Sequence, residues 1–132
     1  MSGPKTQAPS AAEIELIADQ EYRRIPSFMR DKVDPVMIQV VDFPSDEVQE
    51  EMELESPYDL LGLYQGVSLD QSGVHDIRED VDLIFLYRRP LLDYWVETGN
   101  SLEDVVRHVL IHEIGHHFGL SDDDMERIEE AG

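Results

Sequence analysis

The chain has 132 residues, which suits a single domain with a modest hydrophobic core. A formal net charge of −20 argues against nucleic-acid and anionic-membrane partners, because both need basic surfaces, while a hydrophobic content of 41% is too high for a disordered chain. The absence of cysteine excludes a disulfide framework, a thiolate nucleophile and cysteine-ligated zinc. With no signal-peptide pattern and no apolar run of membrane-spanning length, we predict a cytoplasmic protein, and we leave its oligomeric state open.

The N-terminal part predicts a tail followed by a helix. Residues 1–9 combine proline, glycine and small polar residues, which is typical of a flexible tail, so we expect a single domain over residues 10–132. Ser10 and Glu13 have the spacing of a capping box, which predicts that a helix begins there. Pro26 ends this helix, with one more turn over residues 27–33, and we expect the helix to cover a sheet.

A strand and an acidic segment follow. Residues 36–41, V-M-I-Q-V-V, are β-branched and apolar between two prolines, which predicts a buried strand. Residues 46–59 are half acidic and predict a solvated loop or a short surface helix. The alternative for this segment is a surface that attracts basic substrates, or a secondary cation site.

Two further strands are predicted on either side of a loop. Residues 60–69, L-L-G-L-Y-Q-G-V-S-L, contain glycines that indicate a bend or a close approach by another backbone. Residues 82–88, D-L-I-F-L-Y-R, form the clearest strand pattern of the chain. The loop between these segments would close a long hairpin, and we place its His75 on the surface.

The C-terminal third is predicted to be helical. Residues 91–97 suggest a short helix, and the capping pattern that begins at Ser101 starts a longer one that runs to about Phe118. Gly119 stands where a glycine in the left-handed conformation would end that helix. A final short helix is expected over residues 122–131.

The long helix carries the motif H-E-x-x-H. His112 and His116 are four residues apart, so both imidazoles lie on one helix face and can bind the same metal ion. Glu113 flanks them and is our candidate general base, which would take a proton from zinc-activated water. The alternative is that both histidines are core residues bonded to backbone, with Glu113 paired to an arginine.

A third ligand is needed, because catalytic zinc uses three protein ligands. Asp122 completes the string H-E-x-x-H-x-x-G-x-x-D, which resembles the extended zinc motif of the metzincins with aspartate at the third position. Asp123 is the next candidate, and Asp122 also suits the first turn of a helix. We interpret His108 as a second-layer or solvent-facing residue, and we expect His117 to point away from the metal.

The segments L-L-G-L-Y-Q-G-V, D-L-I-F-L-Y-R-R-P-L-L and V-L-I-H-E-I-G-H-H-F-G-L-S-D-D-D together resemble the small bacterial zincin-like metallopeptidase family. The resemblance covers about residues 10–131. It implies an α+β, minimal zincin fold with a short mixed sheet, an N-terminal covering helix and a central H-E-x-x-H helix. It implies zinc as cofactor, His112, His116 and Asp122 as metal ligands, and Glu113 as the catalytic base.

The expected activity is hydrolysis of peptide bonds. An extended peptide or protein substrate would align along the segment 60–69, where Tyr64 is either an oxyanion donor or a packed aromatic residue. Only seven residues follow Met125, so we expect a substrate cleft that is open on the C-terminal side. One alternative is a metal-binding or latent zincin-like module without efficient peptidase activity, and another is a purely structural α+β protein. Zinc is favoured by the ligand types, although iron binds similar sets.

Overall fold

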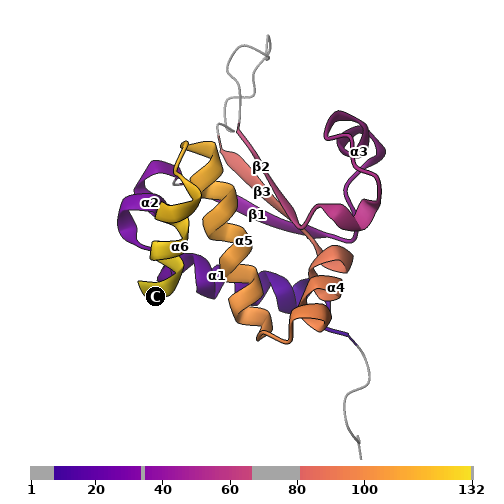
Figure 1. Ribbon diagram of the computed structural model, residues 1–132, viewed down its shortest axis with the longest axis horizontal. Helices are drawn as coiled ribbons and strands as arrows, with labels where there is room; N and C mark the ends of the chain where they lie inside the picture. The colour runs from indigo at the N-terminus through magenta and orange to yellow at the C-terminus, as the bar shows by residue number, and fades with distance from the viewer. Residues whose placement is uncertain (1–7, 34, 67–80, 132) are drawn as a thin grey trace, which may run out of the picture.

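The computed structural model describes residues 8–33, 35–66 and 81–131, which form the predicted α+β arrangement of a minimal zincin-like fold (Figure 1). The elements, in chain order, are α1 (Ala11–Arg24), α2 (Ser27–Val33), β1 (Val36–Val41), α3 (Asp46–Glu51), the 3₁₀ helix η1 (Pro57–Asp59), β2 (Gly62–Gln65), β3 (Asp82–Tyr87), α4 (Arg88–Thr98), α5 (Leu102–His117) and α6 (Asp122–Ala131). Most of the predicted tail, and the predicted loop with His75, lie outside the described residues.

The sheet is short and mixed, as predicted. Its strands lie in the order β1–β3–β2, so that β1 and β2 form its two edges. β1 runs parallel to β3, with Ile38 opposite Ile84, and β2 runs antiparallel to β3, with Tyr64 opposite Ile84. Side chains alternate between the faces of a strand, so these three residues share one face. We call it the inner face; Leu63 and Phe85 belong to the outer face.

The core lies between the inner face and two helices, α1 and α5 (Figure 1). Ile14 of α1, Ile84 and Leu86 of β3, and Leu110 and Ile111 of α5 are all fully buried there. Nine of the sixteen residues of α5 are buried, which confirms the predicted buried central helix. Although α5 is apolar, it falls short of the length and hydropathy of a membrane-spanning segment, as does every other helix in the described part of the chain.

Local sequence features set the helix ends as predicted. Ser10 and Glu13 form the capping box of α1, in which each side chain accepts a hydrogen bond from the backbone N–H of the other residue. The Ser101 hydroxyl accepts from the Asp104 N–H at 3.0 Å and starts α5. Gly119 has a φ of 76°, the left-handed conformation that ends the helix and turns the chain toward α6.

Two predictions are corrected. The expected buried strand β1 is an edge strand: Val40 is buried, but Met37 on the outer face is 54% exposed, because no helix of the described chain covers that part of the face. Helix α4 begins at Arg88, directly after β3, rather than at residue 91. Pro90 is tolerated there because the N–H groups of a first helical turn have no intrahelical partner.

Candidate metal centre and catalytic carboxylate

Three histidines form a stripe along α5. His108, His112 and His116 occupy successive turns, because residues four apart lie on one side of a helix. The ring centroids of His108 and His112 are 4.1 Å apart, and those of His112 and His116 are 5.8 Å apart. Several imidazole nitrogens are thereby collected on the side of α5 that faces α6.

A carboxylate from the last turns of α6 meets this stripe. One oxygen of Glu129 lies 2.7 Å from His108 Nδ1, and the other lies 3.1 Å from His112 Nε2. One ligand atom from each of these three residues lies within 4.8 Å of the other two. Burial acts to raise the pKa of Glu129, but hydrogen bonds and charge from the two histidines outweigh it and lower that pKa. The carboxylate is therefore held in its ionised, metal-binding form.

This histidine–glutamate cluster, His108, His112 and Glu129, fits a zinc ion. Two imidazole nitrogens and one carboxylate oxygen are common zinc donors, and three protein ligands leave a position open. All three side chains are partly exposed, between 23% and 36%, so an ion can reach them from solvent. The described structure thus brings together a candidate three-ligand metal site.

Two contacts between α5 and α6 hold Glu129 in place. The buried Arg107 side chain donates hydrogen bonds to the backbone carbonyls of Glu129 and Ile128, at 2.9 and 3.2 Å, and so caps the end of α6. At the other end, Gly115 lets the fully buried Met125 approach α5: a Cβ at position 115 would lie 2.3 Å from the Met125 sulfur. The crossing of these helices therefore depends on a residue inside the H-E-x-x-H motif.

Glu113 faces a different part of the molecule. It follows His112 by about 100° around the helix, which turns it toward the sheet. Its Oε1 accepts a hydrogen bond from the backbone N–H of Tyr64 on β2, at 3.3 Å. Burial raises the pKa of Glu113. The charge of His116, the hydrogen bond from the Tyr64 N–H and the charge of His112 all act to lower that pKa, but burial outweighs them. A carboxylate with a raised pKa is a stronger base than an ordinary one, which suits it to accepting a proton.

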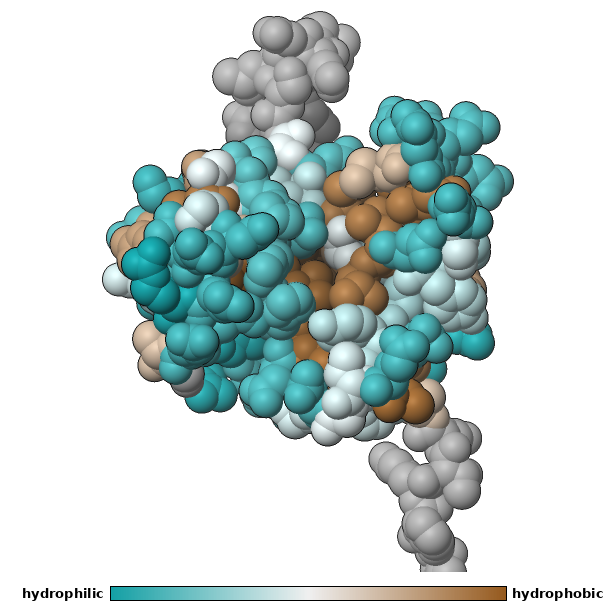
Figure 2. Space-filling view, viewed as in Figure 1, coloured by the Kyte–Doolittle hydropathy of each residue, from teal (hydrophilic) through white to brown (hydrophobic). Residues whose placement is uncertain are grey.

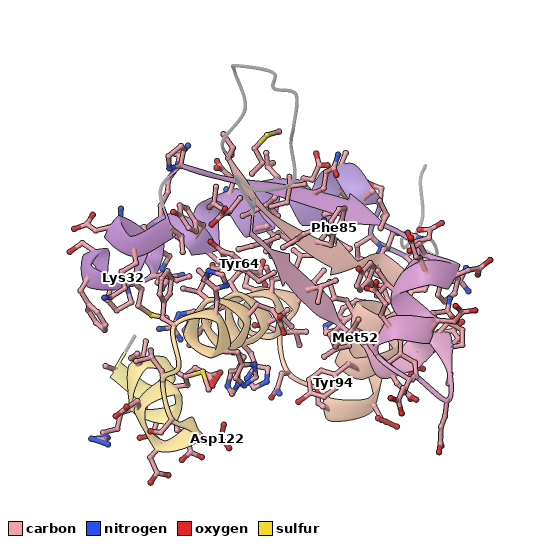
Figure 3. The ribbon with its side chains drawn as sticks, turned by 90° about the horizontal axis from the view of Figure 1, so that it is seen from above. Lys32, Met52, Tyr64, Phe85, Tyr94 and Asp122 are labelled. Atoms are coloured by element: carbon pink, nitrogen blue, oxygen red, sulfur yellow. The ribbon has the colours of Figure 1, made fainter. Side chains whose placement is uncertain are left out.

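The Tyr64 side chain packs against the end of α5. Its ring stacks on His117 with centroids 4.0 Å apart, and its hydroxyl donates to Asp82 Oδ2 at 2.5 Å. Burial and this hydrogen bond raise the pKa of Tyr64 above its usual range. Figure 3 shows Tyr64 beside α5, while Asp122 lies on α6. Tyr64 thus has the contacts of a packed aromatic residue in this arrangement.

The residues predicted from the motif are only partly brought together. His112 belongs to the histidine–glutamate cluster, whereas His116 and Asp122 are exposed and do not belong to any three-ligand group of the described residues. Asp122 is the first residue of α6, whose first turn is capped by Ser121 through the Asp124 N–H at 3.1 Å. The assignment of His116 and Asp122 as ligands stays a prediction.

Glu129 was not among the sequence-based candidates. The i, i+4 spacing from His108 to His112 was visible, but that spacing alone does not separate a ligand from a surface histidine. No local pattern marks Glu129, because it reaches the histidines only through the crossing of α5 and α6. That crossing is a tertiary property, set by the turn at Gly119 and the contact at Gly115.

The comparison with known families agrees with this geometry. A sequence model described as a zincin-like metallopeptidase matches residues 33–131, a segment that includes the whole sheet, the H-E-x-x-H helix and α6. No curated protein matches the chain. The family match covers well over half of the chain and includes every residue of the candidate site, so the chain belongs to the zincin-like metallopeptidase family.

Proposed function

We propose that this protein is a zinc-dependent peptidase that hydrolyses peptide bonds in extended segments of its substrates. One observation carries the proposal: Glu113, beside the histidine stripe, is partly buried and hydrogen-bonded to the backbone of the edge strand β2. A candidate base is thereby held between a metal-binding helix and a strand edge to which a peptide can bind. Membership of the zincin-like metallopeptidase family supports the same reaction.

His112 is common to two candidate sets of zinc ligands. The first set is the histidine–glutamate cluster, and the second is the predicted set with His116 and Asp122. When bound, zinc supplies Lewis-acid polarisation of the substrate carbonyl and makes water more acidic. Each set takes two histidines from α5, one of them His112, and a carboxylate from α6, so either one would hold the metal on the helix that carries Glu113.

Glu113 would move the proton in this reaction. Its carboxylate accepts a proton from the attacking water and delivers it to the nitrogen of the leaving amine. The Tyr64 N–H orients the carboxylate, and partial burial raises its affinity for the proton. Proton transfer of this kind contributes about 10²–10⁴-fold to the rate.

The edge of β2 is our proposed binding strand for the substrate backbone. The Leu61 carbonyl accepts from the Tyr87 N–H, whereas the N–H of Tyr64 is directed away from β3 to Glu113. Alternate residues of β2 therefore point their backbone groups outward. Gln65 and Gly66 are exposed at this edge, so an extended peptide has access to it.

The test is the substitution Glu113→Gln in zinc-loaded protein. We expect wild type to cleave a mixture of denatured proteins, and the variant to lose at least about 100-fold in rate, because glutamine cannot accept the proton. Zinc content, measured by elemental analysis after desalting, should be the same in both. Equal cleavage by the two proteins would show that Glu113 is not the base.

A second candidate function is metal binding without efficient cleavage. One observation favours it: Glu129 contacts both His108 and His112. This cluster therefore extends one helical turn away from His116, the second histidine of the H-E-x-x-H motif. The same samples distinguish the two functions. One zinc per chain with no Glu113-dependent cleavage of any protein in the mixture would support the metal-binding module.

A further inference from the structure

A groove crosses the outer face of the sheet beside α3. It has a volume of about 760 Å³ and reaches from β1 to the edge strand β2. Its walls are the sheet on one side and α3 with its flanking residues on the other. The lining residues include Phe43, Val48, Met52, Leu63, Phe85 and Tyr87.

The floor of the groove is apolar and aromatic. The rings of Phe85 and Tyr87 are parallel within 1°, with centroids 6.3 Å apart, and Leu63 lies next to Phe85 across the strand pair. Figure 2 shows exposed hydrophobic surface in the hollow between the hydrophilic surface of α3 and the helices α5 and α6. Such a surface favours an aliphatic or aromatic side chain.

The rim of the groove is acidic. Among the described residues that line it, the charged ones are Glu47 and Glu51, which are exposed and lie one turn apart on α3. No basic residue lines the groove in the described chain, and the whole protein carries a net charge of −20. A basic group on the ligand would be attracted to this rim, and an acidic one repelled.

The groove adjoins the candidate catalytic carboxylate. Tyr64 lines the groove at the β2 edge, and its backbone N–H donates to Glu113. Burial, together with the charge of Glu113, raises the pKa of Tyr87 to about 12, and Tyr87 also lines the groove. A peptide bound along β2 would direct alternate side chains to the outer face, where the groove begins.

We propose that this groove is a specificity site, which accepts an apolar side chain of the substrate together with a lysine or arginine two residues away. Two residues is the spacing that keeps both side chains on the same face of an extended peptide. The inference rests on the proposed peptidase function and names its substrate class. The apolar side chain packs on Phe85 and Leu63, and the basic side chain lies against Glu47 and Glu51.

Binding to matched peptides tests the site. The probes are four fluorescein-labelled eight-residue peptides that differ at two positions, with leucine or serine at one and lysine or glutamate two residues on. The Glu113→Gln variant is used with zinc, so that the peptides are not turned over. Replacing leucine by serine should weaken binding about ten-fold, from the lost apolar burial. Replacing lysine by glutamate should weaken it by a similar factor of about ten.

Charge reversal on α3 tests whether Glu47 and Glu51 cause the preference for lysine over glutamate in the peptide. The double variant Glu47→Lys, Glu51→Lys should lose or reverse the preference for lysine over glutamate and keep the preference for leucine. The double variant Asp46→Lys, Glu50→Lys is the matched control, because it changes the net charge equally and both residues are exposed on the same short helix without lining the groove. Equal loss in the control would mean that net charge alone sets the preference, and would overturn the assignment of the groove.

Cleavage by wild type separates this inference from the peptidase proposal. Preferential binding of the leucine–lysine peptide without cleavage supports the groove and contradicts the proposed activity. Glu113-dependent cleavage of all four peptides at equal rates supports the activity and contradicts the groove.

Discussion

The contact between Gly115 and Met125 makes a quantitative prediction about the fold of the metal centre. In most helix interiors, replacing glycine by alanine stabilises a protein by about 0.5–1 kcal/mol, because glycine loses more backbone entropy on folding. Here the new methyl group would lie 2.3 Å from the Met125 sulfur and 2.8 Å from its Cγ. Met125 is fully buried, so it cannot simply rotate into solvent.

We therefore expect Gly115→Ala to destabilise the protein. Overpacking of a core costs about 1–3 kcal/mol, which outweighs the gain in helix propensity. The displaced α6 should also carry Glu129 away from the histidine stripe. Urea unfolding followed by circular dichroism measures the first effect, and retention of zinc after desalting measures the second.

The decisive control is the same substitution in a Met125→Ala background. Met125→Ala removes both clashing atoms and costs about 2–5 kcal/mol by itself, as the loss of a buried side chain. In that background Gly115→Ala should become stabilising by about 0.5–1 kcal/mol. If Gly115→Ala stabilised the wild-type protein by the same amount, the close crossing of α5 and α6 would be wrong.

Two further predictions concern a buried tyrosine and the metal ligands. Burial, together with the charge of Glu113, raises the pKa of Tyr87 to about 12, so this contribution to stability is complete below pH 10 and is lost between pH 10 and 12. The loss amounts to about 2–3 kcal/mol for a phenol that is 2% exposed, and Tyr87→Phe should flatten the dependence of the unfolding free energy on pH over that interval. For the ligands, His108→Ala should lower zinc retention if the histidine–glutamate cluster binds the ion, whereas Asp122→Ala should lower it if the predicted set does. Elemental analysis of the two variants gives the answer, and unchanged zinc in both would exclude both sets.

The sequence predicts the elements of this fold well, because their ends are marked locally. Ser10, Ser101 and Gly119 set helix ends through hydrogen bonds and backbone conformations within a few residues, and the structure confirms each one. β1 was placed correctly along the chain, but its burial was not. Whether a strand of apolar residues is central or at an edge depends on its partners, and those are fixed only when the sheet forms.

The candidate site divides in the same way between local and tertiary information. The helix with His112 and Glu113 follows from the motif, since a spacing along a helix is enough to place both residues. The partner of Glu113 is the Tyr64 backbone, 49 residues earlier in the chain, and no side-chain pattern encodes that contact. Glu129 is also unmarked, because its position depends on how α6 lies on α5.

The two sides of α5 explain why there is one candidate base but two candidate ligand sets. Glu113 directly follows His112, about 100° further around the helix, so it faces β2 whichever turn of the histidine stripe binds zinc. The ligand set, in contrast, depends on whether zinc lies toward His108 or toward His116. Helix α6 carries a candidate carboxylate for each alternative: Glu129, which lies beside His108, and Asp122, its first residue, which belongs to the set with His116. A shift of one helical turn, about 5 Å, separates the alternatives. The motif therefore identifies the helix and the proposed base, while the packing of α6 distinguishes the two candidate ligand sets.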